Sequence, residues 1–233
     1  MKRKIEFERI IFLIVLFCLP FGLHSFSFEA GENTDTIQIK EKQIRVGCIG
    51  DSITFGDGVS QTRKKDAWTY VLDRKLPERY HVYNYGVSGA TAQFISDNPY
   101  VYHEEWDTIH KNPMDIYILM LGTNDSKDHN WNSKRFKKDY TRLVEDILSL
   151  PTNPEVIIML PCRVYAPING MNNDTLKLEV IPIVRSIAKK NDVPIINLYA
   201  ATEKHPEYFV DGVHPDEAGN KKIAEIIYKK LYD

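Results

Sequence analysis

Residues 44–56, IRVGCIGDSITFG, carry an apolar run directly into a Gly-Asp-Ser turn. The run ends at Ile49 and predicts a buried strand. The turn that follows presents Ser52 at the end of that strand, where a side chain is free to react. Three further segments with reactive residues also fall in loops between predicted elements: NYGVSG at 84–89, GTND at 122–125 and DGVHP at 211–215.

Short apolar runs alternate with longer amphipathic stretches from residue 44 onward. The clearest helix spans 133–150, where one apolar stripe ends at Pro151. A second helix over 174–190 contains Pro182, which predicts a kink or break. This alternation predicts an α/β fold with a five-stranded parallel sheet covered by helices on both faces. The predicted strands are 44–49, 80–85, 116–121, 156–160 and 195–198, and the other predicted helices are 66–76 and 216–231.

The composition describes an ordinary globular chain. It has 233 residues, of which 43% are hydrophobic and 27% charged, with a formal net charge of −2. This size fits one domain with a large core. The charge balance argues against nucleic-acid binding, which usually shows a basic excess. No His-Glu-x-x-His, Cys-x-x-Cys or Walker segment occurs, so we expect no metal and no cofactor.

The N-terminus has a different character. A basic segment, 1–9, precedes an almost wholly apolar run, 10–23, which is short for a membrane span of about 20 residues. The pattern predicts a signal peptide over 1–27, a linker over 28–42 and the domain over 43–233. The mature protein is then secreted or periplasmic, without stable membrane association. A retained N-terminal membrane anchor is the alternative.

Two cysteines, Cys48 and Cys162, follow the leader, and each lies in or beside an apolar strand-like run. Two thiols do not make a disulfide framework. We therefore predict buried free thiols rather than a bridge or a nucleophile.

The loop residues match the chemistry of acyl transfer. A serine hydroxyl is a poor nucleophile until a base takes its proton, and His214 is the candidate base for Ser52. Asp211 lies three residues before this histidine, within reach across a tight turn, and can hold its tautomer. The oxyanion of the intermediate needs hydrogen-bond donors. The candidates are the backbone N–H groups of Ser52 and Gly86 and the side-chain amide of Asn124.

Each motif also has a structural interpretation when taken alone. Gly-Asp-Ser is a common turn, Gly-Thr-Asn-Asp can be a helix-capping loop, and His214 can be a satisfied loop histidine. Ligand sites in parallel sheets form beyond the carboxyl ends of the strands, which would bring all four segments to one rim. This shared position favours the catalytic interpretation.

The combination resembles the SGNH hydrolase superfamily, also called GDSL esterases and lipases, over about residues 43–231. The resemblance implies a flavodoxin-like three-layer α/β/α sandwich. It assigns the signature serine, glycine, asparagine and histidine to Ser52, Gly86, Asn124 and His214, with Asp211 as the acidic partner. Longer phrases, 50–59, 122–127 and 159–165, resemble an exported bacterial subgroup described as sialate O-acetylesterase-like or carbohydrate acetylesterases.

The resemblance implies a serine esterase that removes acetyl or other short acyl groups from a small-molecule or oligosaccharide ester. We expect Asp51, Trp131, Arg163 and Tyr165 to contact substrate, since aromatic rings stack on sugars and Arg163 can hold a carboxylate. Loop packing and a surface salt bridge are the alternatives for these side chains. The alternative functions are a lysophospholipase or acyl-thioesterase, and a non-catalytic carbohydrate-binding module. The oligomeric state is not predicted.

Overall fold

The structure is a computed structural model that describes residues 42–232. The predicted signal peptide, 1–27, lies outside the described residues, and so does all of the predicted linker but its last residue. Both stay predictions. Within the described residues, no helix is long and apolar enough to cross a membrane.

A single parallel sheet forms the centre of the described domain, with strand order β2-β1-β3-β4-β5. The predicted α/β class and the five-stranded sheet are confirmed. The strand order reverses between β1 and β3, and in parallel sheets ligands bind at the carboxyl ends of the strands at such points. The strands are β1 (Ile44–Gly50), β2 (Tyr80–Gly86), β3 (Ile116–Met120), β4 (Glu155–Leu160) and β5 (Ile195–Asn197).

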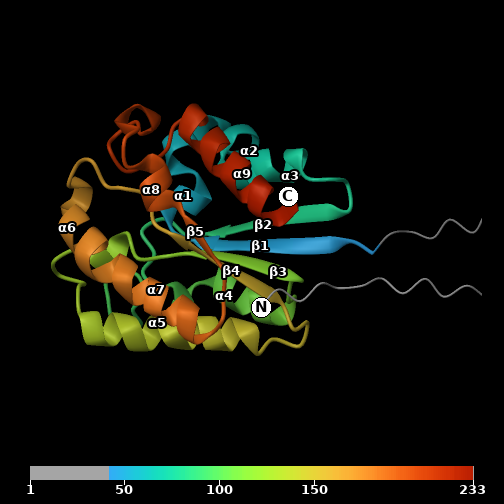
Figure 1. Cartoon of the computed structure of the whole chain (residues 1–233), viewed down its shortest axis with the longest axis horizontal. Coiled ribbons are helices and arrows are strands. Elements are labelled where there is room, and N and C mark those ends of the chain that lie inside the picture. Colours follow the sequence, from blue (N-terminus) through green and yellow to red (C-terminus); the bar gives the residue numbers. More distant parts are fainter. Residues whose placement is uncertain (1–41, 233) are drawn as a thin grey trace, which may run out of the picture. The chain divides into compact units, whose positions relative to one another are not determined.

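Helices cover both faces of the sheet and give three layers (Figure 1). One face carries α1 (Ser52–Phe55), α2 (Arg63–Asp66), α3 (Trp68–Lys75) and α9 (Glu217–Tyr232). The other carries α4 (Glu104–Lys111), α5 (Ser133–Leu148), α6 (Asn173–Thr175) and α7 (Ile181–Lys190). The remaining short elements are α8 (Leu198–Thr202) and the turns η1 (Asp57–Thr62), η2 (Tyr100–Tyr102), η3 (Asn124–Ser126), η4 (Ile168–Gly170), η5 (Leu176–Val180) and η6 (Pro206–Tyr208).

Alternate residues of the central strands supply two separate cores. Tyr117 and Leu119 of β3 join a cluster with Phe136 on the α5 side. Their neighbour Ile118 joins a second cluster with Trp68 on the α3 side. All five side chains are fully buried. Burial on both faces explains why these strands are apolar throughout instead of alternating with polar residues.

Two predicted helices differ in detail from the structure. The helix predicted over 66–76 is divided at Ala67, whose backbone is extended, and Asn220 Oδ1 accepts the Trp68 N–H at 2.9 Å. The helix over 174–190 does not break at Pro182. It widens instead into a π-helical turn, η5, just before the proline, which lies in the first turn of α7. A wider turn relieves the backbone clash that a proline causes inside a helix.

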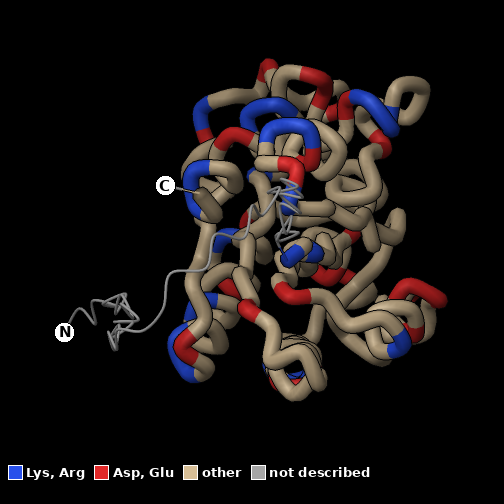
Figure 2. The backbone as a smooth tube through the Cα atoms, turned by 90° about the vertical axis from the view of Figure 1, so that its right-hand side faces the viewer, with Lys and Arg blue, Asp and Glu red and all other residues tan. Residues whose placement is uncertain are grey.

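The distribution of charged residues and the state of the two cysteines agree with the sequence analysis. On the side of the molecule seen in Figure 2, Lys and Arg are interspersed with Asp and Glu. Cys48 and Cys162 are buried and free, as predicted. Burial raises the pKa of the Cys162 thiol to about 12, so the group stays protonated and is a poor nucleophile.

Candidate active site

Ser52 is the first residue of α1 and follows β1 after one intervening residue. Asp51 caps this short helix, because its Oδ1 accepts the Ile53 N–H at 3.0 Å. The turn depends on Gly50, where a Cβ would lie 2.2 Å from Thr54 Oγ1. Ser52 is therefore held in a fixed position at the carboxyl end of β1.

His214 and Asp211 occupy one tight turn before α9. Asp211 Oδ2 lies 2.6 Å from His214 Nδ1, and its Oδ1 accepts the backbone N–H groups of Val213 and His214 at 2.9 and 2.8 Å. Gly212 permits the turn, since its φ is +86° and a Cβ there would lie 2.7 Å from the Ala166 Cβ. The carboxylate thereby fixes both the backbone and the ring of the histidine.

The ring reaches Ser52 from the far end of the sequence. His214 Nε2 lies 2.9 Å from Ser52 Oγ, between residues 162 positions apart. Because the ionised Asp211 accepts a hydrogen bond from Nδ1–H, the proton stays on Nδ1, and Nε2 is left as the acceptor for the serine hydroxyl. The predicted meeting of these two side chains is present in the structure.

The surroundings of Asp211 favour its charged form. Partial desolvation raises its pKa, but the hydrogen bonds from the His214 ring and from the two backbone N–H groups outweigh that effect. The net result is a pKa below the ordinary value of 3.8. Asp211 is therefore ionised at neutral pH, as required of a group that stabilises an imidazolium.

The Gly86 N–H, one of the expected oxyanion donors, already has an acceptor. Asn84 Oδ1 accepts it at 2.9 Å. A Cβ at Gly86 would lie 2.2 Å from Phe55 N, so this glycine lets β2 pack against α1. We therefore correct the assignment of Gly86: its position reflects close packing, and its N–H is not available to a substrate.

Gly89, in the same sequence segment, is a better candidate donor. Its φ is +78°. Among the described residues neither its N–H nor that of Ser52 has a hydrogen-bond acceptor. The neighbouring Ala90 carbonyl accepts Asn124 Nδ2 at 3.1 Å, which holds this loop against the third candidate donor. The NYGVSG segment contains both glycines, and only the backbone geometry distinguishes them.

Asp125 holds the Gly89 loop in place, a role that the sequence interpretation missed. Its Oδ2 accepts the Ala92 N–H and its Oδ1 the Gln93 N–H, both at 2.9 Å. Asp125 is fully buried, and burial raises its pKa to about 6 although the two N–H groups favour the charged form. The sequence contained one sign of this role, because Asp125 is the fourth residue of the Gly-Thr-Asn-Asp segment.

Asp51, expected to contact substrate, is fully buried. Its Oδ2 has no hydrogen-bond partner among the described residues. Burial raises the pKa of Asp51 to about 6, and the hydrogen bond from Ile53 offsets only part of this effect. We assign Asp51 a positioning role beneath Ser52 instead of direct contact with substrate.

The raised pKa of Asp51 makes the stability of the protein depend on pH. The folded protein binds this proton up to about pH 6, whereas the unfolded chain releases it near 3.8. The folded state therefore binds more protons between these values, and stability falls as the pH rises through them. The unfolding free energy of the wild type should therefore increase when the pH is lowered from 7 to 5. We expect this increase to be about 1 kcal/mol smaller in Asp51→Asn.

Urea unfolding of both proteins at the two pH values measures this difference. Asp107→Asn, at an exposed position of α4, is the matched control and should leave the pH dependence as in the wild type. An identical pH dependence in Asp51→Asn and wild type would show that Asp51 is already ionised in the folded state at pH 5.

Two other residues predicted to contact substrate, Trp131 and Arg163, interact with residues other than Ser52. Trp131 packs 5.3 Å from the Phe136 ring, and its Nε1 donates to Glu179 Oε2 at 3.0 Å. Arg163 lies 5.1 Å from the Tyr165 ring centre. Its Nη1 donates to the Glu203 carbonyl at 3.4 Å, and no ion pair involves this arginine among the described residues. Their contact with substrate stays a prediction.

Tyr165 is held rigidly. Its hydroxyl donates to the Thr202 carbonyl and accepts the His205 N–H at 3.0 Å. The ring packs against Phe209 at 5.4 Å. Its backbone N–H donates to the Gly212 carbonyl at 2.7 Å, so Tyr165 borders the turn that carries His214.

Residues 48–222 match the GDSL-like lipase/acylhydrolase family. The chain belongs to this family. Membership confirms the predicted resemblance to GDSL esterases and lipases. Within the described residues no group of three or more His, Cys, Asp or Glu side chains is arranged to hold a metal ion.

An acetylxylan esterase of Xylanibacter ruminicola is 32% identical over 244 aligned positions, which cover 91% of this chain and 51% of that protein. The GDSL-like chain thus spans about half the length of this relative. Among the solved structures that share the fold of the GDSL-like chain are a carbohydrate acetylesterase and an aryl esterase. Est24, a carbohydrate acetylesterase from Sinorhizobium meliloti, has a TM-score of 0.68 and 21% identity, covering 81% of this chain and 98% of its own. The M. smegmatis aryl esterase has a TM-score of 0.67 and 22% identity, with the same coverage.

Proposed function

We propose that this GDSL-like protein is a serine esterase that removes acetyl groups from carbohydrates. The observation that carries the proposal is the continuous hydrogen-bonded chain from Ser52 Oγ through the His214 ring to Asp211, with distances of 2.9 and 2.6 Å. This chain supplies a nucleophile, a base and a group that stabilises the charged base. A non-catalytic module would have no need for such an alignment.

The proposed reaction has two halves. Ser52 Oγ attacks the acetyl carbonyl while His214 Nε2 takes the hydroxyl proton, and a tetrahedral oxyanion forms. The intermediate collapses when His214 gives this proton to the sugar oxygen, which leaves as an alcohol. Water, deprotonated by His214, then attacks the acetyl-serine, and acetate leaves with Ser52 restored. The N–H groups of Ser52 and Gly89 and the Asn124 amide stabilise both oxyanions.

Two observations support acetylated carbohydrate as the substrate. The relative with 32% identity is an acetylxylan esterase. The pocket next to the histidine turn has two carboxylates and two amides, Asp128, Asp174, Asn172 and Asn173, among its ten lining residues. Such a lining suits a polyhydroxylated group better than a fatty acyl chain.

The acyl preference tests this proposal against the lysophospholipase alternative. With p-nitrophenyl esters of increasing acyl length, we expect kcat/KM to be highest for acetate and to fall by at least about tenfold by octanoate, because each added methylene lacks an apolar surface to bury. Acetylated xylan should release acetate, measured directly. Activity that rises with chain length, without acetate release from xylan, would contradict the carbohydrate acetylesterase assignment.

A further inference from the structure

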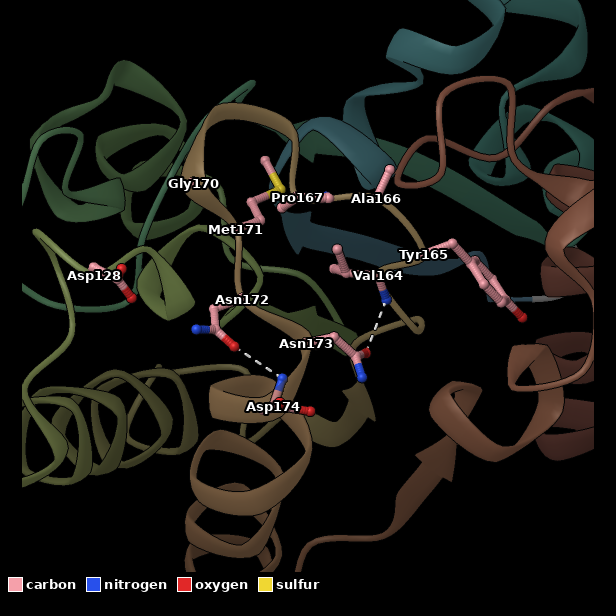
Figure 3. A pocket seen from close by; sticks show the side chains of 10 residues that line it. All are labelled: Asp128, Val164, Tyr165, Ala166, Pro167, Gly170, Met171, Asn172, Asn173 and Asp174. Carbon is pink, nitrogen blue, oxygen red and sulfur yellow. Dashed lines mark hydrogen bonds between the residues drawn. The ribbon is translucent and has the colours of Figure 1, made fainter.

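Figure 3 shows a pocket of about 370 Å³. Its volume falls in the range of small-molecule sites, about 300–1,000 Å³. Its lining residue Ala166 contacts the turn that carries Asp211 and His214, because a Cβ at Gly212 would lie 2.7 Å from the Ala166 Cβ. Asp128 comes from the loop after η3, and the other nine lining residues come from the segment after β4 and from α6. The lining residues are Asp128, Val164, Tyr165, Ala166, Pro167, Gly170, Met171, Asn172, Asn173 and Asp174.

The segment that follows β4 is attached to the candidate active site at two points. The Tyr165 N–H donates to the Gly212 carbonyl at 2.7 Å, inside the histidine turn. The Asn172 N–H donates to Ser126 Oγ at 3.1 Å, two residues beyond Asn124. The pocket is therefore positioned to hold the part of a substrate that extends from the ester at Ser52.

The polar groups of the pocket have unused hydrogen-bonding capacity of both kinds. Asn172 Oδ1 caps α6 and Asn173 Oδ1 accepts the Val164 N–H at 3.2 Å, which leaves both NH₂ groups without an acceptor among the described residues. The carboxylates of Asp128 and Asp174 have no partner among those residues either. Sugar hydroxyls donate and accept hydrogen bonds, so they match this mixture of free donors and acceptors.

The charge of the lining is of one sign. Two of the ten lining residues are aspartates, and none is Lys, Arg or His. A negatively charged group placed here would lie beside two carboxylates without a counter-ion, which is unfavourable. The half-buried Ala166 and the exposed Pro167 supply an apolar surface for the C–H face of a sugar ring.

We infer that this pocket is a subsite for a neutral, hydroxyl-rich sugar, and that Asp128 and Asp174 exclude sugars that carry a carboxylate. The inference rests on the proposed esterase function and narrows its substrate class. It favours acetylated neutral glycans over acetylated sialic acids, the other substrate class suggested by the sequence resemblance.

A matched pair of substrates tests the charge discrimination. Acetylated methyl xyloside and acetylated methyl glucuronide differ in the carboxylate that the glucuronide adds to the ring. We expect wild-type kcat/KM to favour the xyloside at least tenfold. Asp128→Asn with Asp174→Asn should lower this preference to twofold or less, chiefly through a lower KM for the glucuronide.

Glu78→Gln with Glu155→Gln is the control, because it changes the charge equally at exposed positions beside or at the amino-terminal ends of β2 and β4. It should retain the wild-type preference. Equal wild-type rates on both sugars, or an unchanged preference in the Asp128/Asp174 double variant, would overturn the inference. The inference would also be overturned if the enzyme hydrolysed p-nitrophenyl acetate but neither of the two sugar esters. That result would leave the esterase assignment intact. Loss of all ester hydrolysis would instead overturn the proposed function and, with it, the inference.

Discussion

Replacing Ser52 by alanine is expected to lower kcat for p-nitrophenyl acetate on the order of 10⁵-fold, because no other group can form the acetyl-enzyme. Ser52 is nearly buried, and its Oγ is bonded to His214 Nε2. Removing one hydroxyl leaves the capping bond from Ile53 N to Asp51 intact. The variant should therefore unfold at nearly the wild-type temperature while losing activity.

A fluorophosphonate probe provides a second measurement, since it reacts only with an activated serine. The label should map to the peptide that contains Ser52 in the wild type and be absent from Ser52→Ala. Ser60→Ala, at an exposed position of η1, is the matched control and should label normally. His214→Ala should label far more slowly, because the hydroxyl loses its base. Wild-type labelling or turnover in Ser52→Ala would refute the assignment of the nucleophile.

The meeting of Ser52 and His214 could be predicted from the sequence because it follows from topology. Strands that alternate with helices run parallel, and their carboxyl ends share one edge of the sheet. Ser52 follows β1 after one residue, and His214 lies just before the last helix, α9. Nothing beyond the positions of these motifs in the repeating pattern was needed to predict their proximity.

The oxyanion donor could not be predicted in the same way. Gly86 and Gly89 lie three residues apart in one motif, at the end of β2 and in the turn after it, and sequence spacing does not distinguish them. What separates them is the direction of a single N–H bond, which Asn84 Oδ1 accepts at Gly86.

The helix α4 was missed for another reason. Ile109 is its one fully buried residue, so its apolar stripe is too weak to recognise.

Asn124→Ala is expected to lower kcat about 10²–10³-fold with little change in KM, because the lost donor acts on the oxyanion and not on the bound ester. Asn124 is 1% exposed, and one hydrogen of its amide is used by the Ala90 carbonyl. The second hydrogen has no acceptor among the described residues, which leaves it for the substrate. Steady-state kinetics on p-nitrophenyl acetate separate the two parameters.

Loss of a buried hydrogen bond also destabilises the fold, so the kinetic effect must be separated from unfolding. Asn132→Ala is the matched control, because Asn132 Oδ1 caps α5 by accepting the Arg135 N–H at 3.0 Å. This variant should lose about 1 kcal/mol of unfolding free energy and retain wild-type kcat. If Asn124→Ala loses comparable stability yet keeps its kcat, or loses activity only through KM, the amide holds the Gly89 loop and gives no stabilisation to the transition state.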